Sequence, residues 1–247
     1  MRFLRAPVIL IFAFMLVTLA GCAGQAARPG AAASPSSTPS AAATPGPATA
    51  PAPGPSSGVP APSPSSRVLS SRVAYGWLWP NGSVPGRVAH SYPVPPVPEL
   101  VSISVGEHPA GSGQPAFDRV AFTFTNAFPS YRFEFTTSLV GEGSGKVIPL
   151  TGPDVLKIVF TQAQAHTAGG TRSTIISQPG RPIHFQIMTD LAQAGDFEGA
   201  LTYGIGVARP ILHSNPQSAV RAYEVETITA NGQHRYVVAI DIAGKPL

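Results

Sequence analysis

The sequence predicts an all-β fold, an antiparallel β-sandwich of about seven or eight strands, over residues 99–247. Three observations support this prediction. Short runs alternate large apolar residues with small or polar ones, as in Val120–Thr125 and Tyr131–Thr136, which is the pattern of strands with one buried face. Gly, Pro, Asn and Ser interrupt these runs at turns. No helical pattern of about 10 to 15 residues separates the runs, so we expect antiparallel pairing, in a sandwich or a partly open barrel, rather than parallel crossovers.

The start of the chain has the features of a secretion signal. A basic start, Met1–Arg5, precedes the apolar run Val8–Thr18, which is shorter than the about 20 residues that span a bilayer. Leu19–Cys22 follows at once, and Cys22 is the only cysteine of the chain. We expect residues 1–21 to be removed as a signal peptide.

The string Leu-Ala-Gly-Cys at residues 19–22 resembles the lipobox of bacterial lipoproteins. The resemblance implies cleavage before Cys22 and attachment of lipid to its sulfur, with acyl chains such as palmitate. Each buried methylene contributes about 0.8 kcal/mol, and more than one chain is needed for a durable anchor. We therefore expect the protein to be held on the extracytoplasmic face of the cell membrane through the lipid on Cys22.

Residues 22–66, which begin with this cysteine, are predicted to be a disordered linker. Of the 44 positions 23–66, all but three are Ala, Pro, Ser, Thr or Gly. Without large apolar side chains, nothing offsets an ordering entropy of about 1 to 2 kcal/mol per residue. We expect a tether that would reach about 140 Å if fully extended in a polyproline conformation at about 3.1 Å per residue. A segment that binds a partner or carries sugars is the alternative interpretation.

Residues 67–98 form an aromatic and Pro-rich lead-in segment that contains both tryptophans of the chain. Its large side chains follow the period of a strand, which predicts four large groups on one side: Val73, Tyr75, Trp77 and Trp79. Two roles are open for the three aromatic residues. They pack against the following domain, as Trp usually does, or they bind a ligand by stacking on sugar rings or in a partner's groove.

Seven runs within residues 99–247 have strand patterns: Val120–Phe124, Tyr131–Thr136, Val155–Phe160, Ile183–Ile187, Leu201–Val207, Val220–Ile228 and Tyr236–Ile242. Asn231 and Gly232 lie between the last two runs and give the clearest hairpin signal, because a tight turn needs the positive φ that both residues tolerate. We expect the last two strands to be antiparallel neighbours.

The basic character of the whole chain does not indicate a nucleic-acid partner. The formal net charge is +4, but residues 99–247 hold 10 basic and 12 acidic residues, which gives this part a net charge of −2. A phosphate-binding surface needs clustered Lys and Arg, and no two basic residues are adjacent in the sequence. We expect no nucleic-acid partner.

The sequence shows no evident catalytic or metal-binding set. The six histidines are at least 18 residues apart, and no serine has the G-x-S-x-G spacing. Asp196 and Glu198 are a candidate Ca²⁺ or paired-acid site, with turn carboxylates as the simpler interpretation. Asp118 and Arg119 indicate a surface ion pair or a loop latch. We expect no enzyme activity, no cofactor and no bound metal.

Several motifs, in this order along the chain, resemble the AMIN-like domain of secreted and lipid-anchored proteins of high-GC Gram-positive bacteria: Val105–His108, Phe117–Val120, Pro129–Phe133, Ala194–Gly199 and Tyr203–Gly206. The likeness spans roughly residues 99–244. Gly195 and Gly199 suit turns, and Gly204 and Gly206 leave one strand face bare for close packing. The AMIN domain, a β-sandwich that directs cell-wall amidases and other envelope machines to peptidoglycan, is a more remote likeness.

Together these features predict a non-catalytic binding module, anchored by lipid in the cell envelope, that engages peptidoglycan or an envelope protein. A carrier of a small hydrophobic ligand is the alternative, because the mean hydropathy is +0.14 and Phe-rich strands would line a large apolar pocket. An enzyme that assembles its catalytic residues from distant parts of the chain is a third possibility.

Overall fold

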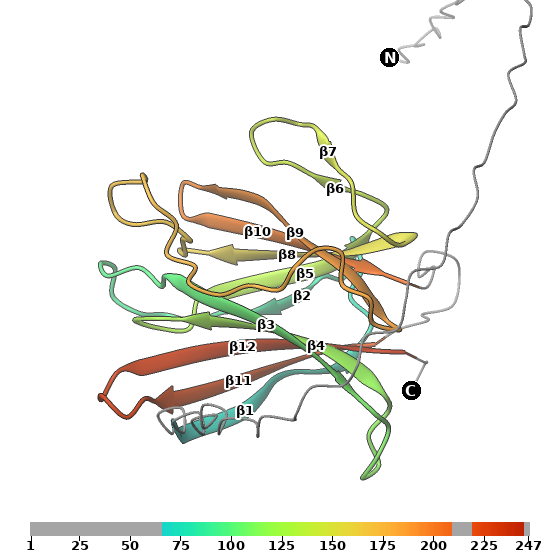
Figure 1. The fold of residues 1–247 in the computed structure, drawn as a ribbon, viewed down its shortest axis with the longest axis horizontal. Coiled ribbons are helices and arrows are strands. Elements are labelled where there is room, and N and C mark those ends of the chain that lie inside the picture. Colours follow the sequence, from blue (N-terminus) through green and yellow to red (C-terminus); the bar gives the residue numbers. More distant parts are fainter. Residues whose placement is uncertain (1–65, 209–218, 245–247) are drawn as a thin grey trace, which may run out of the picture. The chain divides into compact units, whose positions relative to one another are not determined.

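The computed structural model of the protein describes residues 66–208 and 219–244, and these residues form strands and loops without a helix. The predicted signal peptide, Cys22 and nearly all of the linker lie outside the described residues. Every pair of neighbouring strands is antiparallel, and the strands form two five-stranded sheets that lie one above the other (Figure 1). The predicted all-β sandwich is confirmed.

Sheet A contains, in spatial order, β1 (Arg67–Leu78), β11 (Val220–Ile228), β12 (His234–Ala243), β4 (Phe117–Phe124) and β3 (Leu100–His108). Sheet B contains β2 (Gly86–Val88), β5 (Ser130–Thr136), β8 (Asp154–Thr161), β10 (Ala200–Val207) and β9 (Met188–Phe197). Two short strands, β6 (Leu139–Val140) and β7 (Val147–Ile148), pair only with each other. The lead-in segment thus supplies β1 to one sheet and β2 to the other.

Aromatic rings fill the space between the two sheets. The Phe160 ring of β8 lies 4.9 Å from that of Phe122 and 5.0 Å from that of Phe124, measured between centroids. Phe122 also lies 5.2 Å from the ring of Tyr203 on β10. These side chains are almost completely buried. Burial of one large apolar side chain contributes about 1.5 to 3 kcal/mol, so each ring of this layer stabilises the fold.

A second, smaller apolar cluster lies beneath the β6–β7 hairpin. Leu139 of β6 packs there with Val155 of β8 and with two alanines of β9. Gly204 makes this approach possible, because a Cβ at this position would lie 2.7 Å from Leu139 Cδ2. A Cβ at Gly206 would overlap the carbonyl oxygen of Thr151. The expectation that these two glycines leave a strand face bare for close packing is confirmed.

The other two glycines of the family motifs have different roles. Gly199 has φ +75° and follows Glu198, with φ +52°, in the turn between β9 and β10, so the expected turn is confirmed. Gly195 lies inside β9 and not in a turn. A Cβ at Gly195 would come within 2.6 Å of Glu142 Cβ, so a close approach of the neighbouring chain accounts for this glycine.

The long connection between β8 and β9 covers the free edge of β3. Leu100 N donates a hydrogen bond to Gln164 O at 2.8 Å, and Ile103 N donates one to Ser177 O at 2.9 Å. Thr174 Oγ1 donates to Leu100 O at 2.7 Å. Exposed strand edges promote unwanted pairing, and these bonds protect this one.

Six of the seven predicted runs lie within strands, and the exceptions have physical reasons. Ile183–Ile187 is a loop whose two isoleucines are buried in the core, so a loop that packs inward has the apolar pattern of a strand. Strands β3 and β9 were not predicted. Register shifts between Leu100 and Ser102 in β3, and between Gly195 and Gln193 in β9, interrupt their alternation. The last two strands are antiparallel neighbours as predicted, and Gly232 has φ +78° in their turn.

Candidate functional site

The aromatic side chains of the lead-in segment separate into two environments. Tyr75 and Trp79 pack against the core between the sheets, and the Tyr75 ring meets Phe133 edge-on at 5.0 Å. Val73 is 53% exposed. Trp77 contacts residues of the outer face of sheet A. The prediction that four large groups share one side of the strand is therefore wrong.

Two irregularities in β1 explain this separation. The register of β1 against β11 shifts between Val73 and Tyr75, where β1 advances two residues and β11 advances one. It shifts again between Tyr75 and Leu78, where β1 advances three residues and β11 advances two. Each extra residue reverses which face the following side chains occupy. The sequence does not show where such bulges occur, so the alternating pattern does not predict which face the side chains beyond a bulge occupy.

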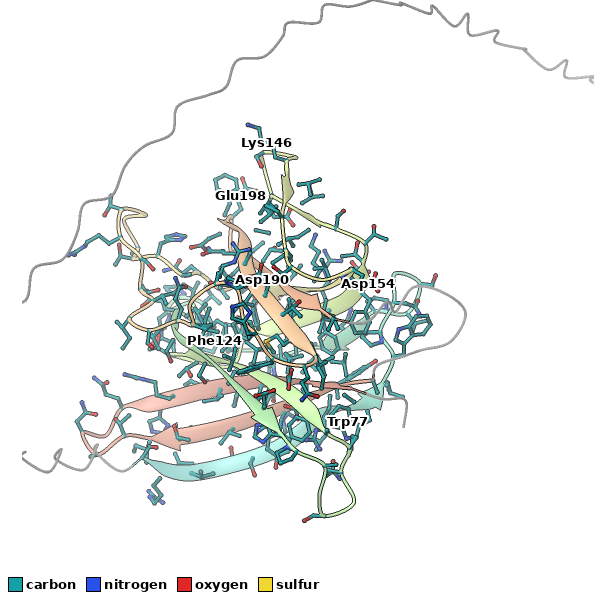
Figure 2. All side chains as sticks on the ribbon, turned by 45° about the vertical axis from the view of Figure 1, so that its right-hand side comes forward. Trp77, Phe124, Lys146, Asp154, Asp190 and Glu198 are labelled. Carbon is teal, nitrogen blue, oxygen red and sulfur yellow. The ribbon has the colours of Figure 1, made fainter. Side chains whose placement is uncertain are left out.

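Trp77 belongs to a cluster of rings and guanidinium groups on the outer face of sheet A. The Arg221 guanidinium carbon lies 4.5 Å from the Trp77 ring centroid, and the Phe117 ring lies 5.8 Å from it. Trp77 Nε1 donates a hydrogen bond to Gln114 Oε1 at 3.2 Å, in the loop between β3 and β4. Figure 2 shows Trp77 beside this loop. A cation held over an indole ring forms a cation–π contact, which contributes about 0.5 to 2 kcal/mol of stabilisation.

A buried carboxylate holds the arginines of this cluster in place. Asp241 of β12 is fully buried and accepts two hydrogen bonds from Arg119, at 2.6 and 3.0 Å. It accepts two more from Arg221, at 3.0 and 2.7 Å. The hydrogen bond to Asp241 raises the pKa of Arg119 above its usual value. The "Trp77 cluster" consists of Trp77, Gln114, Phe117, Arg119, Arg221 and Asp241.

Asp118 and Arg119 do not pair with each other. Successive residues of a strand point to opposite faces, and Arg119 joins the outer cluster while Asp118 is buried. Asp118 Oδ2 accepts hydrogen bonds from the backbone N–H of Ile187, at 3.0 Å, and of Met188, at 2.7 Å. Burial raises the pKa of Asp118 above its ordinary value. The loop-latch interpretation is confirmed for Asp118, and the ion-pair interpretation is wrong.

Glu224 of β11 is at the centre of a polar group that sequence reasoning missed. Its Oε2 accepts a hydrogen bond from Arg72 Nε at 2.8 Å. Its Oε1 accepts one from Tyr131 OH at 3.0 Å and lies 2.8 Å from His90 Nε2. Burial alone would raise the pKa of Glu224, but the hydrogen bonds from His90 and Arg72 outweigh it and hold this pKa below 4.5. The sequence signal that could have identified Glu224 was its position on the inward-facing side of the strand pattern Val220–Ile228.

Asp196 and Glu198 line the same surface hollow of about 480 Å³. Asp196 Oδ2 lies 2.6 Å from His166 Nδ1 and accepts a hydrogen bond from Ala165 N at 3.1 Å. Glu198 lies in the β9–β10 turn. Within residues 66–208 and 219–244, no three His, Cys, Asp or Glu residues are placed to hold a metal ion. The carboxylates act as turn and loop residues here.

The carrier hypothesis requires a large apolar pocket. The packed aromatic rings of β4, β8 and β10 occupy the space between the two sheets. Hollows of about 140 to 480 Å³ occur elsewhere on the described residues, and their linings include Arg, His, Asp or Glu side chains. This arrangement does not support a carrier of a hydrophobic ligand.

Comparison with known proteins identifies the family. Among the described residues, no helix is long and apolar enough to cross a membrane. Searches of curated proteins and of solved structures found no match to this chain. The family model of the AMIN-like domain matches residues 98–243, and such a match indicates an extracytoplasmic, envelope-associated binding module. The match begins after β1 and β2, covers every later strand and includes more than half of the chain, and the chain therefore belongs to the AMIN-like family.

Proposed function

We propose that this protein is a non-catalytic module that binds peptidoglycan and is held on the outer face of the cytoplasmic membrane by lipid on Cys22. The family match over residues 98–243 is the observation that carries the proposal. The Leu-Ala-Gly-Cys string at residues 19–22 and the Pro/Ala/Ser linker after it support the anchoring part. In this arrangement the tether lets the sandwich reach the wall while the lipid keeps it at the membrane.

Trp77 is the predicted binding residue whose position suits contact with a sugar ring. Tyr75 and Trp79 are committed to the core, whereas Trp77 is half-buried on an outer face. One guanidinium group already stacks on its indole ring, and the Asp241 carboxylate holds that guanidinium in place. A ring fixed in this way loses little conformational entropy on binding. In our proposal, Trp77 stacks on wall glycan, and Tyr75 and Trp79 position the strand that carries it.

Sedimentation with isolated peptidoglycan tests the proposal. The full chain, purified in detergent micelles, should sediment with the wall material, and Trp77→Ala should weaken this about tenfold or more because a lost aromatic stacking contact costs about 1 to 3 kcal/mol. Leu78→Ala is the matched control, since Leu78 is the next residue and is 57% exposed. An equal loss in both variants would argue against stacking by Trp77. Absence of sedimentation by the unmodified chain would point to an envelope protein as the partner.

Anchoring is tested separately by Cys22→Ala. The unmodified chain should fractionate with membranes, and the variant should appear in the soluble fraction, because the thioether that carries the lipid cannot form. Mass measurement of the mature N-terminus should show acyl chains on Cys22. Continued membrane association of Cys22→Ala would contradict the anchoring scheme and would leave the wall-binding proposal intact.

A further inference from the structure

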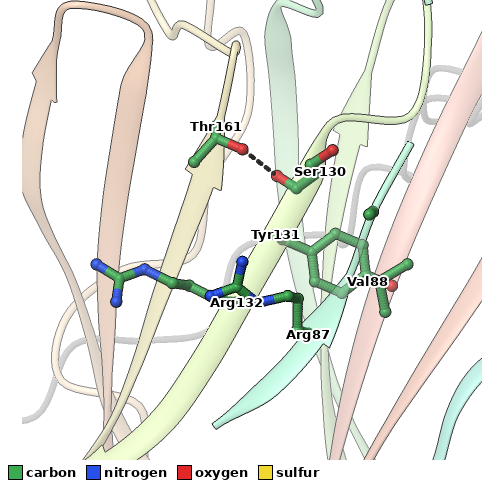
Figure 3. A pocket seen from close by; sticks show the side chains of 7 residues that line it. Arg87, Val88, Ser130, Tyr131, Arg132 and Thr161 are labelled. Carbon is green, nitrogen blue, oxygen red and sulfur yellow. Dashed lines mark hydrogen bonds between the residues drawn. The ribbon is translucent and has the colours of Figure 1, made fainter. Parts of the chain in front are cut away.

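Two arginines face each other on the outer side of sheet B. Arg87 of β2 and Arg132 of β5 are directly opposite partners in the antiparallel register. Their neighbours Val88 and Tyr131 form the next pair and are buried. Since side chains alternate along a strand, both arginines point outward, and both are exposed. Figure 3 shows the two arginine side chains reaching away from the side that Val88 and Tyr131 occupy.

This pair differs from three other strand arginines in having no carboxylate partner. Arg72, Arg119 and Arg221 each form an ion pair with a buried carboxylate. Within the described residues, neither Arg87 nor Arg132 makes a side-chain hydrogen bond or an ion pair. Like charges directly opposite each other on neighbouring strands destabilise a sheet, so the fold retains an unfavourable arrangement at this place.

Within the described residues, no acidic side chain forms an ion pair with Arg87 or Arg132. Glu134 follows Arg132 on the same face of β5 and lies opposite Lys157 in the register with β8. Lys157 forms an ion pair with Glu142 at 3.0 Å, on the loop between β6 and β7. Neither Glu134 nor Glu142 forms an ion pair with Arg87 or Arg132.

A hollow of about 240 Å³ lies at the arginine pair. Its lining includes both arginines, the exposed Ala89, and the hydroxyl-bearing residues Ser130 and Thr161. Ser130 Oγ accepts a hydrogen bond from His90 N at 2.9 Å, and Thr161 Oγ1 donates to Ser130 O at 3.4 Å (Figure 3). These bonds hold Ser130 and Thr161 in place in the lining of the hollow.

We infer that Arg87 and Arg132 form an anion-binding site that takes a free carboxylate of a wall peptide. The inference rests on the proposed function, because it names the wall group that this face recognises. Guanidinium forks bind carboxylates with two parallel hydrogen bonds, and one carboxylate between two such forks removes their mutual repulsion. The hollow of about 240 Å³ that these arginines line together with Ala89 has room for a short side chain next to that carboxylate. Phosphate of an anionic wall polymer is the rival ligand that the test must separate.

The test uses the full chain in detergent micelles and three preparations of isolated wall: untreated, with carboxyl groups amidated, and with phosphate polymers removed by hydrofluoric acid. The variant Arg87→Gln/Arg132→Gln is compared with Arg67→Gln/Arg172→Gln. Arg67 and Arg172 are exposed and lack side-chain partners within the described residues. Their double substitution changes the net charge by the same amount as Arg87→Gln/Arg132→Gln. Thermal unfolding is measured for both, and Arg87→Gln/Arg132→Gln should be no less stable than the unmodified chain because repulsion is removed.

The carboxylate site predicts that amidation of the wall and Arg87→Gln/Arg132→Gln each weaken sedimentation about tenfold or more, whereas removal of phosphate and the control variant do not. Equal sedimentation of both variants would overturn the site and leave wall binding intact. Loss on phosphate removal alone would assign a phosphate ligand and overturn the carboxylate.

A titration with a short peptide separates this inference from the proposed function. Ala-Ala with a free C-terminal carboxylate should bind the unmodified chain, whereas the amidated peptide and Arg87→Gln/Arg132→Gln should show no binding. If the chain does not sediment with any wall preparation but binds the free peptide, the site stands and the wall-binding function fails. If it does neither, both fail.

Discussion

Arg72 on β1 and Glu224 on β11 are direct partners in the sheet register, and Arg72 Nε donates a hydrogen bond to Glu224 Oε2 at 2.8 Å. The family match begins at residue 98, so this bond joins a residue before the match to a buried carboxylate within it. His90, also before residue 98, contacts the other oxygen of Glu224. The lead-in segment therefore completes the polar centre of the sandwich.

Glu224→Gln should lower the free energy of unfolding by about 2 to 4 kcal/mol, because it removes the charge that Arg72, His90 and Tyr131 all engage in a buried place. Urea unfolding followed by circular dichroism measures this loss. Glu226→Gln is the matched control, two residues along the same strand, where Glu226 pairs at the surface with His234. The control should change stability by less than about 1 kcal/mol. Similar losses in the two variants would contradict the role assigned to Glu224.

Stability should also fall in acid through Glu224. Its folded-state pKa is held below 4.5, so the unfolded state binds the proton more readily. The stabilisation is fully present above pH 4.5 and is lost as the pH falls through the lower folded-state pKa. Urea unfolding at a series of pH values should show this loss in the unmodified chain and a smaller one in Glu224→Gln. Equal slopes for the two proteins would show that other groups dominate the acid transition.

Shortening the chain to residues 98–247 should destabilise the sandwich strongly. The change removes β1 and β2, deprives Glu224 of Arg72 and His90, and exposes the edge of β11. We expect lower solubility and a lower unfolding temperature than for residues 66–247, measured side by side by circular dichroism and light scattering. Equal unfolding temperatures would mean that the lead-in segment only lies against an independent domain.

Gly204→Ala should cost about 1 to 3 kcal/mol, because its Cβ would lie 2.7 Å from Leu139 Cδ2 and the β6–β7 hairpin would have to move. Gly76→Ala is the control within another strand, where a Cβ would have no neighbour within 4 Å. Chemical unfolding of the two variants checks the difference. The double variant Gly204→Ala/Leu139→Ala should lose less stability than the sum of the two single losses, and fully additive losses would argue against this contact as the cause.

The sequence by itself determined the fold class and most of the strands, because a strand with one buried face must alternate large and small residues. It also carried the family likeness, since the motifs are continuous along the chain. The same logic identified Gly204 as a residue that permits close packing. Alternation fails where a bulge adds a residue, which is why Trp77 was assigned to the same side as Tyr75 although the two are on different faces.

Only the tertiary structure decided which distant residues meet. Pairing of β1 with β11 brings Arg72 to Glu224, and pairing of β2 with β5 brings Arg87 to Arg132. Neither pairing can be recognised from the local sequence, because the antiparallel register depends on how the two sheets bury their apolar faces together. Each charged residue, read alone, is an ordinary surface group. The role of each arginine depends on the residue opposite it on the neighbouring strand. Arg72 meets the buried carboxylate of Glu224, whereas Arg87 meets a second positive charge, that of Arg132.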